Sequence, residues 1–180
     1  MRFIPSEIPG VILIEPDVHE DARGFFFENY HKDVFAAHGI SKEFIQDNHS
    51  RSSRGTLRGL HTQISPKKQA KLVRVVRGEA YDVAVDIRPA SRTFGKFVAV
   101  TLSEQNKKML YIPDGFAHGF LSLKDNTEIL YKVSEFYSPD TERGIRWDDK
   151  ALAIPWPKLD IEFNVSEKDR HLPCLDDIRR

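Results

Sequence analysis

The stretch from Arg54 to Asp86 constrains the fold more than any other part of the chain. Two apolar, β-branched runs, residues 72–76 and 81–87, flank a turn at Gly78. In the second run the side chains alternate, with one face made of Tyr81, Val83, Val85 and Ile87 and the other of Asp82, Ala84, Asp86 and Arg88. A period of two residues predicts a β-strand, here with one face buried.

Short strands are predicted along most of the chain, at residues 11–15, 24–30, 44–48, 56–61, 70–77, 80–88, 94–102, 108–113, 116–123 and 128–134. Gly, Pro, Asp and Asn separate them, and the nearly regular spacing is typical of an all-β sandwich or barrel. One short helix is predicted over residues 31–38, ended by Gly39. Residues 50–54 are predicted to form a loop, and an irregular C-terminal segment begins at about residue 139.

Length and charge exclude several classes of protein. The 180 residues suit a single domain, 1–180, and the 27 basic and 27 acidic side chains give no net field for nucleic acid. No apolar run reaches transmembrane length, and the N-terminus lacks the apolar core of a signal peptide. The one cysteine, Cys174, allows no intrachain disulfide. We therefore expect a cytoplasmic protein without nucleic-acid or membrane partners.

The segment from Ile112 to Gly119 places a histidine, His118, just after a tight Asp-Gly turn. The spacing resembles the second motif of cupins, small β-barrels in which this histidine often binds a metal. The matching first motif reads His61-Thr62-Gln63, and no Glu follows before Glu79. Because a transition-metal site needs three or four converging ligands, we expect a cupin-type jelly roll that has lost its metal. A structural His118 in the barrel wall is the alternative.

Four polar residues, Arg58, His61, Gln63 and Lys71, lie close together in the sequence and suggest a site for an anionic or carbonyl-bearing ligand. In a regular strand Arg58 has the wrong parity to share a face with His61, and a bulge at Gly59 would correct this. A buried structural histidine is the alternative for His61. The glycine patterns of P-loop and dinucleotide-binding proteins are absent.

A series of motifs carries a specific resemblance. It consists of residues 23–28, 46–50, 55–63 (GTLRGLHTQ), 69–88, 110–120 (LYIPDGFAHGF), 130–132 and 166–169 (SEKD). In order and spacing the series resembles the dTDP-4-dehydrorhamnose 3,5-epimerase family over nearly the whole chain. Two positions depart from the family pattern: Thr62 stands where the family usually has an aromatic residue, and Tyr81 where Phe is common. Neither is a proton-transfer position, and Thr62 leaves the fine shape of the sugar pocket undetermined by the resemblance.

The resemblance implies a homodimeric jelly roll that uses neither metal nor cofactor and epimerises C3 and C5 of dTDP-4-dehydro-6-deoxy-D-glucose. It implies that His61 is the general base, Asp169 its partner, Tyr131 the opposite proton donor and Lys71 the group that stabilises the enolate. Substrate-binding positions fall on Arg23, Phe25, Glu28, Gln46, Asp47, Asn48, Arg58, Gln63, His118, Tyr137, Glu142 and Lys168. Tyr137 falls where an aromatic ring stacks on thymine.

The chemistry explains this set of residues. A 4-keto group acidifies the C–H bonds at C3 and C5, and a nearby ammonium stabilises the enolate oxygen. Inversion needs a second group on the opposite face, since one base cannot serve both faces. The alternatives are an epimerase that inverts only one carbon, a 3,4-ketoisomerase on a dTDP-deoxysugar and a non-catalytic sugar-nucleotide-binding cupin. A metal-dependent cupin oxygenase is a further alternative, which the missing metal ligands disfavour.

Overall fold

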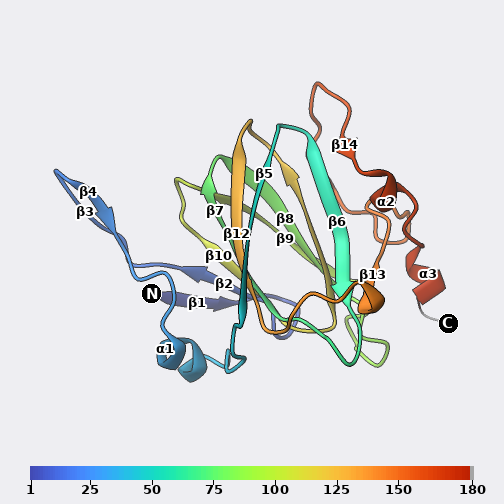
Figure 1. Cartoon of the computed structure of the whole chain (residues 1–180), viewed down its shortest axis with the longest axis horizontal. Helices are drawn as coiled ribbons and strands as arrows, with labels where there is room; N and C mark the ends of the chain where they lie inside the picture. The colour runs from blue at the N-terminus through green and yellow to red at the C-terminus, as the bar shows by residue number, and fades with distance from the viewer. Residues whose placement is uncertain (179–180) are drawn as a thin grey trace.

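The protein, described here by a computed structural model over residues 1–178, consists of two β-sheets that face each other (Figure 1). The all-β prediction is confirmed, and the helices are short. The elements are β1 (Arg2–Pro5), β2 (Ile12–Glu15), β3 (His19–Asp21), β4 (Gly24–Phe26), α1 (Lys32–Ala37), β5 (Gln46–Ser52), β6 (Thr56–Gln63), β7 (Lys71–Arg77), β8 (Glu79–Asp86), β9 (Phe97–Ser103), β10 (Met109–Ile112), β11 (Phe116–Ser122), β12 (Thr127–Val133), η1 (Pro139–Thr141), β13 (Glu142–Gly144), β14 (Asn164–Val165), α2 (Glu167–Arg170) and α3 (Leu175–Ile178).

Strand order is that of a jelly roll. The first sheet runs β1-β2-β10-β7-β12-β5 and the second β13-β6-β11-β8-β9, with every one of these neighbours antiparallel. The short β14 adds to β6 in parallel. Apolar side chains of the two inner faces fill the space between the sheets, among them Val73, Val75 and Ile129 from the first sheet and Ala84 and Phe120 from the second.

Strand β8 is buried on both faces, so the prediction of one buried face is wrong. Its apolar face packs outward, where Val83 and Val85 contact Ile145 and Leu152 of the C-terminal segment. The face that carries Asp82 and Asp86 points into the barrel, and both carboxylates are fully buried. The outer face is buried because the irregular segment folds back over the second sheet, which the alternation of β8 could not reveal.

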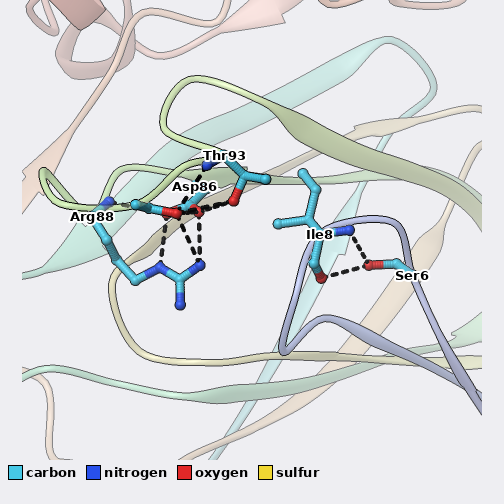
Figure 2. Close-up of polar contacts among 6 residues, drawn as sticks. Ser6, Ile8, Asp86, Arg88 and Thr93 are labelled. Carbon is cyan, nitrogen blue, oxygen red and sulfur yellow. Dashed lines mark hydrogen bonds and ion pairs between the residues drawn. The ribbon is translucent and has the colours of Figure 1, made fainter.

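Two interior acids of β8 therefore need partners. Asp86 finds them locally, as Figure 2 shows: its carboxylate accepts hydrogen bonds from Arg88 at 2.7 and 2.9 Å and from the Thr93 hydroxyl at 2.6 Å. Burial opposes ionisation, but these hydrogen bonds hold the pKa of Asp86 well below its usual range. The hydrogen-bonding capacity of Asp86 is therefore used within the turn that follows β8.

Figure 2 also shows the Ser6 hydroxyl, which donates to the Ile8 carbonyl oxygen and accepts from the Ile8 amide.

Several predicted boundaries differ from the structure. Strand β5 continues through Ser52, so the predicted loop at 50–54 is wrong for its first half; these residues pair with β12, a long-range partner that overrides the polar composition. Strand β4 ends at Phe26 instead of continuing to residue 30, and β1 and β3 were not predicted. The predicted helix at 31–38 is confirmed as α1. Within residues 1–178, no helix is long and apolar enough to span a membrane.

The hairpin of β3 and β4 extends away from the two sheets (Figure 1). Its tip exposes large apolar surface, because Phe25 and Phe26 are 59% and 70% exposed. At the opposite side of the molecule, α2 and α3 lie beside the second sheet (Figure 1). The Ser166 side chain caps α2 by accepting a hydrogen bond from the Asp169 amide at 3.1 Å.

A register shift in the pairing of β6 with β11, opposite Gly59, confirms the predicted irregularity. Leu57 and Leu60 pack on the outer face, whereas Arg58 and His61 face the interior although they are three residues apart. The shift needs a residue without a side chain. A Cβ on Gly59 would lie 2.5 Å from the Gly119 Cα and 2.9 Å from the His118 carbonyl oxygen.

We predict that Gly59→Ala destabilises the protein by roughly 2–6 kcal/mol, since backbone strain at positive φ and a steric clash each cost about 1–3 kcal/mol. Gly24→Ala is the matched control: both glycines have φ of +125°, but no atom lies within 4 Å of a Cβ at Gly24. Urea unfolding of the two variants measures the difference. Equal midpoints would show that the approach of β6 to β11 is not sterically limited.

Candidate active site

The interior of the barrel is hollow at one end. A cavity of about 430 Å³ lies between the sheets, and a neighbouring one of about 230 Å³ shares His61, Lys71 and Tyr131 with it. Strands β5, β6, β7, β11 and β12 and helix α2 supply side chains to these walls. The structure thus brings together residues predicted from distant motifs, namely Gln46, Asn48, Arg58, His61, Gln63, Lys71, His118, Tyr131, Tyr137, Glu142, Lys168 and Asp169.

His61 and Asp169 form a close pair at the wall of the larger cavity. The His61 Nε2 atom lies 2.7 Å from Asp169 Oδ1, and Asp169 Oδ2 accepts the Gly59 amide at 3.1 Å. Burial works to raise the pKa of Asp169, but the hydrogen bond and charge of His61, together with hydrogen bonds from Gly59 and Ser166, outweigh it and lower the pKa. An ionised carboxylate can only accept, so Nε2 carries the proton and Nδ1 is the basic nitrogen.

A second imidazole–carboxylate pair lies deeper in the barrel. Both oxygens of Asp82 lie 3.0 Å from His118 Nε2, and the two side chains are buried. Asp82 was not among the predicted site residues. Its position on β8, in register with Phe120 and two residues from Ala84, places it on the interior face. The signal was the pair of acids, Asp82 and Asp86, on one face of a strand that is otherwise largely apolar, but the sequence did not reveal which face was inward.

Lys71 is a buried ammonium beside this second pair. Its Nζ atom donates to the His61 carbonyl oxygen at 3.4 Å. Burial lowers the pKa of Lys71 to about 8, while the negative charges of Asp82 and Glu142 act in the opposite direction. Lys71 is therefore mostly charged at neutral pH, and the charge is poorly solvated, which strengthens its interaction with any anion that forms in the cavity.

Tyr131 comes from β12 and lines both cavities. Burial raises the pKa of its phenol, and the charge of Arg58 opposes that rise. The phenol therefore stays protonated at neutral pH and can donate. Arg58 is held by two contacts from its guanidinium, to the Ser52 hydroxyl at 3.1 Å and to the Arg51 carbonyl oxygen at 3.3 Å.

Three side chains form a polar chain between the two cavities, with Tyr137 and Glu142 in the wall of the smaller one and Lys168 in the wall of the larger one. The Tyr137 hydroxyl donates to Glu142 Oε2 at 2.8 Å, and Lys168 Nζ lies 2.5 Å from the same oxygen. Burial works to raise the pKa of Glu142, but the hydrogen bonds from Lys168 and Tyr137 lower it. The carboxylate is therefore charged, and it links the rim of the barrel to α2.

Four predicted substrate-binding residues lie outside these walls. Arg23 and Phe25 are on the projecting hairpin, where Arg23 is paired with Asp21 at 2.5 Å and Phe25 packs against Lys107. Glu28 follows the hairpin and is exposed. Asp47 faces the outer side of β5, where it is paired with Lys132 at 2.9 Å.

The described residues, 1–178, include no group of three or more His, Cys, Asp or Glu side chains that could hold a metal ion. Both cavity histidines direct Nε2 at a carboxylate. The arrangement provides an imidazole held by a carboxylate, a buried ammonium and a protonated phenol around one space. Such a set can remove a proton next to a carbonyl, stabilise the oxyanion and return a proton.

Comparison with known proteins gives a consistent result. A sequence profile for dTDP-4-dehydrorhamnose 3,5-epimerase matches residues 5–177. A protein of that name from Shigella flexneri is 56% identical over 158 residues, 87% of each chain. The crystal structure of a dTDP-6-deoxy-D-glucose-3,5-epimerase from Legionella pneumophila in complex with dTDP-4-keto-L-rhamnose is 44% identical, with a TM-score of 0.94 over 97% of this chain and 93% of that one. A 3′-monoepimerase from Streptomyces bikiniensis in complex with dTDP-quinovose is also similar, at 36% identity and a TM-score of 0.89 over 96% and 87% of the two chains.

We predict that Asp82→Asn lowers the pKa of Lys71 below its value of about 8, because the substitution removes a negative charge that favours the ammonium. Glu142→Gln lowers it by less, since Glu142 acts more weakly on Lys71. Titration of 13Cε-labelled lysine by NMR measures the shift directly. An unchanged Lys71 titration in Asp82→Asn would contradict the assigned charge coupling.

Proposed function

The chain belongs to the dTDP-4-dehydrorhamnose 3,5-epimerase family, and we propose that it inverts C3 and C5 of dTDP-4-dehydro-6-deoxy-D-glucose to give dTDP-4-dehydro-L-rhamnose in dTDP-L-rhamnose synthesis. It is an isomerase. The observation that carries the proposal is the convergence of the His61–Asp169 pair, Lys71 and Tyr131 on one cavity inside the barrel. These are the groups that an enolate mechanism requires.

His61 removes the proton. Its Nδ1 atom is the basic nitrogen because Nε2–H is held by Asp169 at 2.7 Å. When the imidazole takes a proton from C3 or C5, the ionised Asp169 stabilises the imidazolium that forms. The hydrogen bond from the Gly59 amide to Asp169 supports its ionised form, so the same bulge that places His61 also supports its partner.

Lys71 stabilises the enolate. Negative charge appears on O4 only when the proton leaves, so an ammonium near O4 acts mainly on the transition state, and such donors contribute about 3–4 kcal/mol. The ammonium is lost as pH rises through about 8, the pKa of Lys71. Turnover therefore falls on the alkaline side near that pH. His118, whose Nε2 atom is held by Asp82, lines the same cavity as Lys71 and forms a hydrogen bond to the sugar.

Tyr131 returns the proton to the opposite face. Its raised pKa keeps the phenol protonated, which suits an acid, and Arg58 favours the phenolate that is left behind. Because a single enolate oxygen serves both carbons, the same base and acid act at C3 and C5 in turn. The nucleotide half binds at the rim, where Tyr137 stacks on thymine and Gln46, Asn48, Glu142 and Lys168 supply polar contacts.

The chain acts as a homodimer. Support comes from the projecting hairpin, whose exposed Phe25, Phe26 and Arg23 do not line either of the two cavities that contain His61, Lys71 and Tyr131. A second copy that covers this hairpin would bury its apolar tip and give Arg23, Phe25 and Glu28 a role in substrate binding. Asp47 is likewise proposed to act in the assembled enzyme. Sedimentation equilibrium measures the assembly, and a monomeric mass would contradict it.

The reaction needs neither metal nor cofactor, because proton transfer and charge stabilisation are all supplied by side chains. Both cavity histidines are engaged by carboxylates, which supports a protein-only site. We also place the enzyme in the cytoplasm, in keeping with its single cysteine, Cys174.

Inversion of a single carbon is the second candidate. It is favoured by the similarity to the Streptomyces bikiniensis 3′-monoepimerase, whose fold matches with a TM-score of 0.89. Thr62, which departs from the family pattern, lines the smaller cavity between His61 and Gln63 and is the residue on which altered regiochemistry would depend.

The decisive experiment is NMR of the C3 and C5 positions during incubation of dTDP-4-dehydro-6-deoxy-D-glucose with the enzyme in D₂O, without added metal. Deuterium at both carbons with accumulation of the L-lyxo product supports the proposal. Deuterium and inversion at one carbon supports the monoepimerase, carbonyl migration to C3 supports a ketoisomerase, and the absence of exchange contradicts an epimerase acting on this sugar.

We predict that His61→Ala lowers kcat by roughly 10²–10⁴-fold, the usual contribution of a general base. Asp169→Asn lowers it on a similar scale, because the amide no longer stabilises the imidazolium. Binding of dTDP, measured by calorimetry, changes little in either variant. A normal rate in His61→Ala would remove the base from the mechanism.

Tyr131→Phe separates proton removal from inversion. The variant still exchanges substrate hydrogen with D₂O through His61, but inversion slows by roughly 10²-fold or more because the acid on the other face is missing. Tyr30→Phe, a change in the cluster around Phe35 and Phe44 on the far side of the first sheet, is the control. Inversion that keeps pace with exchange in Tyr131→Phe would exclude Tyr131 as the acid.

A further inference from the structure

The segment that carries Tyr137 has no regular structure. Residues 134–138 connect β12 to η1 at the rim of the smaller cavity, and the Tyr137 side chain is 53% exposed. An exposed ring can serve as a stacking platform only if its main chain is fixed, because ordering a loose loop on binding costs free energy. The groups that hold residues 136–138 therefore decide whether the platform exists before substrate arrives.

The amide of Gln63 holds this segment on both sides of Tyr137. Its Oε1 atom accepts the Ser138 N–H at 2.7 Å, and its Nε2 atom donates to the Phe136 carbonyl at 3.2 Å and the Lys67 carbonyl at 2.6 Å. One partner is a donor and two are acceptors, so the amide has only one possible orientation. The side chain is 5% exposed and both its N–H groups are used, which leaves no donor for substrate.

Gln46 provides a further side-chain contact to the main chain of residues 136–138. Its Oε1 atom accepts the Tyr137 N–H at 3.1 Å, and its Nε2 atom donates to Asn48 Oδ1 at 2.9 Å. Three consecutive residues, 136–138, thus each have a main-chain group bonded to a glutamine from β5 or β6. These strands also carry Asn48 and His61, so the rim and the reacting groups share one rigid support.

We propose that Gln63 is a positioning residue that presents Tyr137 to the base of the nucleotide, and that it determines affinity for the dTDP part of the substrate without contacting it. The proposal rests on the proposed function for the identity of the nucleotide. Because the base lies far from the bonds that change, this contact contributes equally to the ground and transition states. Loss of Gln63 should accordingly raise KM and leave kcat nearly unchanged.

The test is Gln63→Met, which keeps the length of the side chain and removes its polar atoms. We expect KM for the dTDP-sugar and Kd for dTDP, the latter by calorimetry, to rise together by about tenfold, the scale of one to two lost hydrogen bonds in a buried site. We expect kcat within about twofold of the unaltered enzyme. Gln105→Met, at an exposed glutamine whose side-chain amide donates to Glu104, is the control and should change neither value.

A double-mutant cycle shows whether Gln63 acts through Tyr137. In a Tyr137→Ala background, Gln63→Met should raise Kd for dTDP by less than twofold, because the platform is already absent. A purely structural role for Gln63 would give the same rise with or without Tyr137. If Gln63→Met does not fold, Gln63→Glu takes its place, since the carboxylate still accepts from Ser138 but cannot donate to the two carbonyls.

Three results would overturn the proposal: an unchanged Kd for dTDP in Gln63→Met, a fall in kcat with unchanged KM, or a full effect that persists in Tyr137→Ala. Failure of the proposed function is recognised separately. In that case the unaltered enzyme does not turn over the dTDP-sugar, while the dTDP calorimetry still measures the coupling of Gln63 to Tyr137.

Discussion

The close approach of β6 and β11 determines where the reacting groups lie. Two glycines, Gly59 and Gly119, face each other there, and a Cβ on either would meet backbone atoms at 2.5–2.6 Å. The resulting shift of register turns both Arg58 and His61 inward and exposes the Gly59 amide to Asp169. The proposed catalytic histidine, its proposed orienting carboxylate and the inward arginine therefore depend on one local departure from strand geometry.

The barrel interior is polar at one end and apolar at the other, and this division separates function from stability. Val73, Val75 and Ile129 fill the apolar part, whereas Lys71 and Asp82 are buried charges at the cavity. Buried charges are costly unless they are paired, and the Asp82–His118 pair beside Lys71 meets that condition. The incomplete compensation leaves the pKa of Lys71 at about 8, so its side chain is mostly an ammonium at neutral pH, as the proposed role in stabilising an oxyanion requires.

In the proposed function, recognition of the nucleotide and chemistry at the sugar use different parts of one scaffold. The proposed reacting groups His61, Lys71 and Tyr131 come from strands β6, β7 and β12. The proposed nucleotide platform, Tyr137, lies on an irregular segment whose main chain is bonded to the side-chain amides of Gln46 and Gln63. Glu142 and Lys168 connect this rim to the helix that carries Asp169, so the two halves of the site are mechanically linked.

The sequence by itself determined the all-β class, because strand periodicity and turn residues are local properties. It also placed His61, Lys71, His118 and Tyr131 in motifs specific enough to name a family. Only the tertiary structure decided that the row of Asp82 and Ala84 faces the interior, since either face of β8 could have been inward until the C-terminal segment covered the other. The family resemblance implied that Asp169 is the partner of His61, but the tertiary structure supplies the physical reason: Asp169 reaches His61 across 108 residues of sequence because α2 packs beside β6, and no local pattern encodes such a contact.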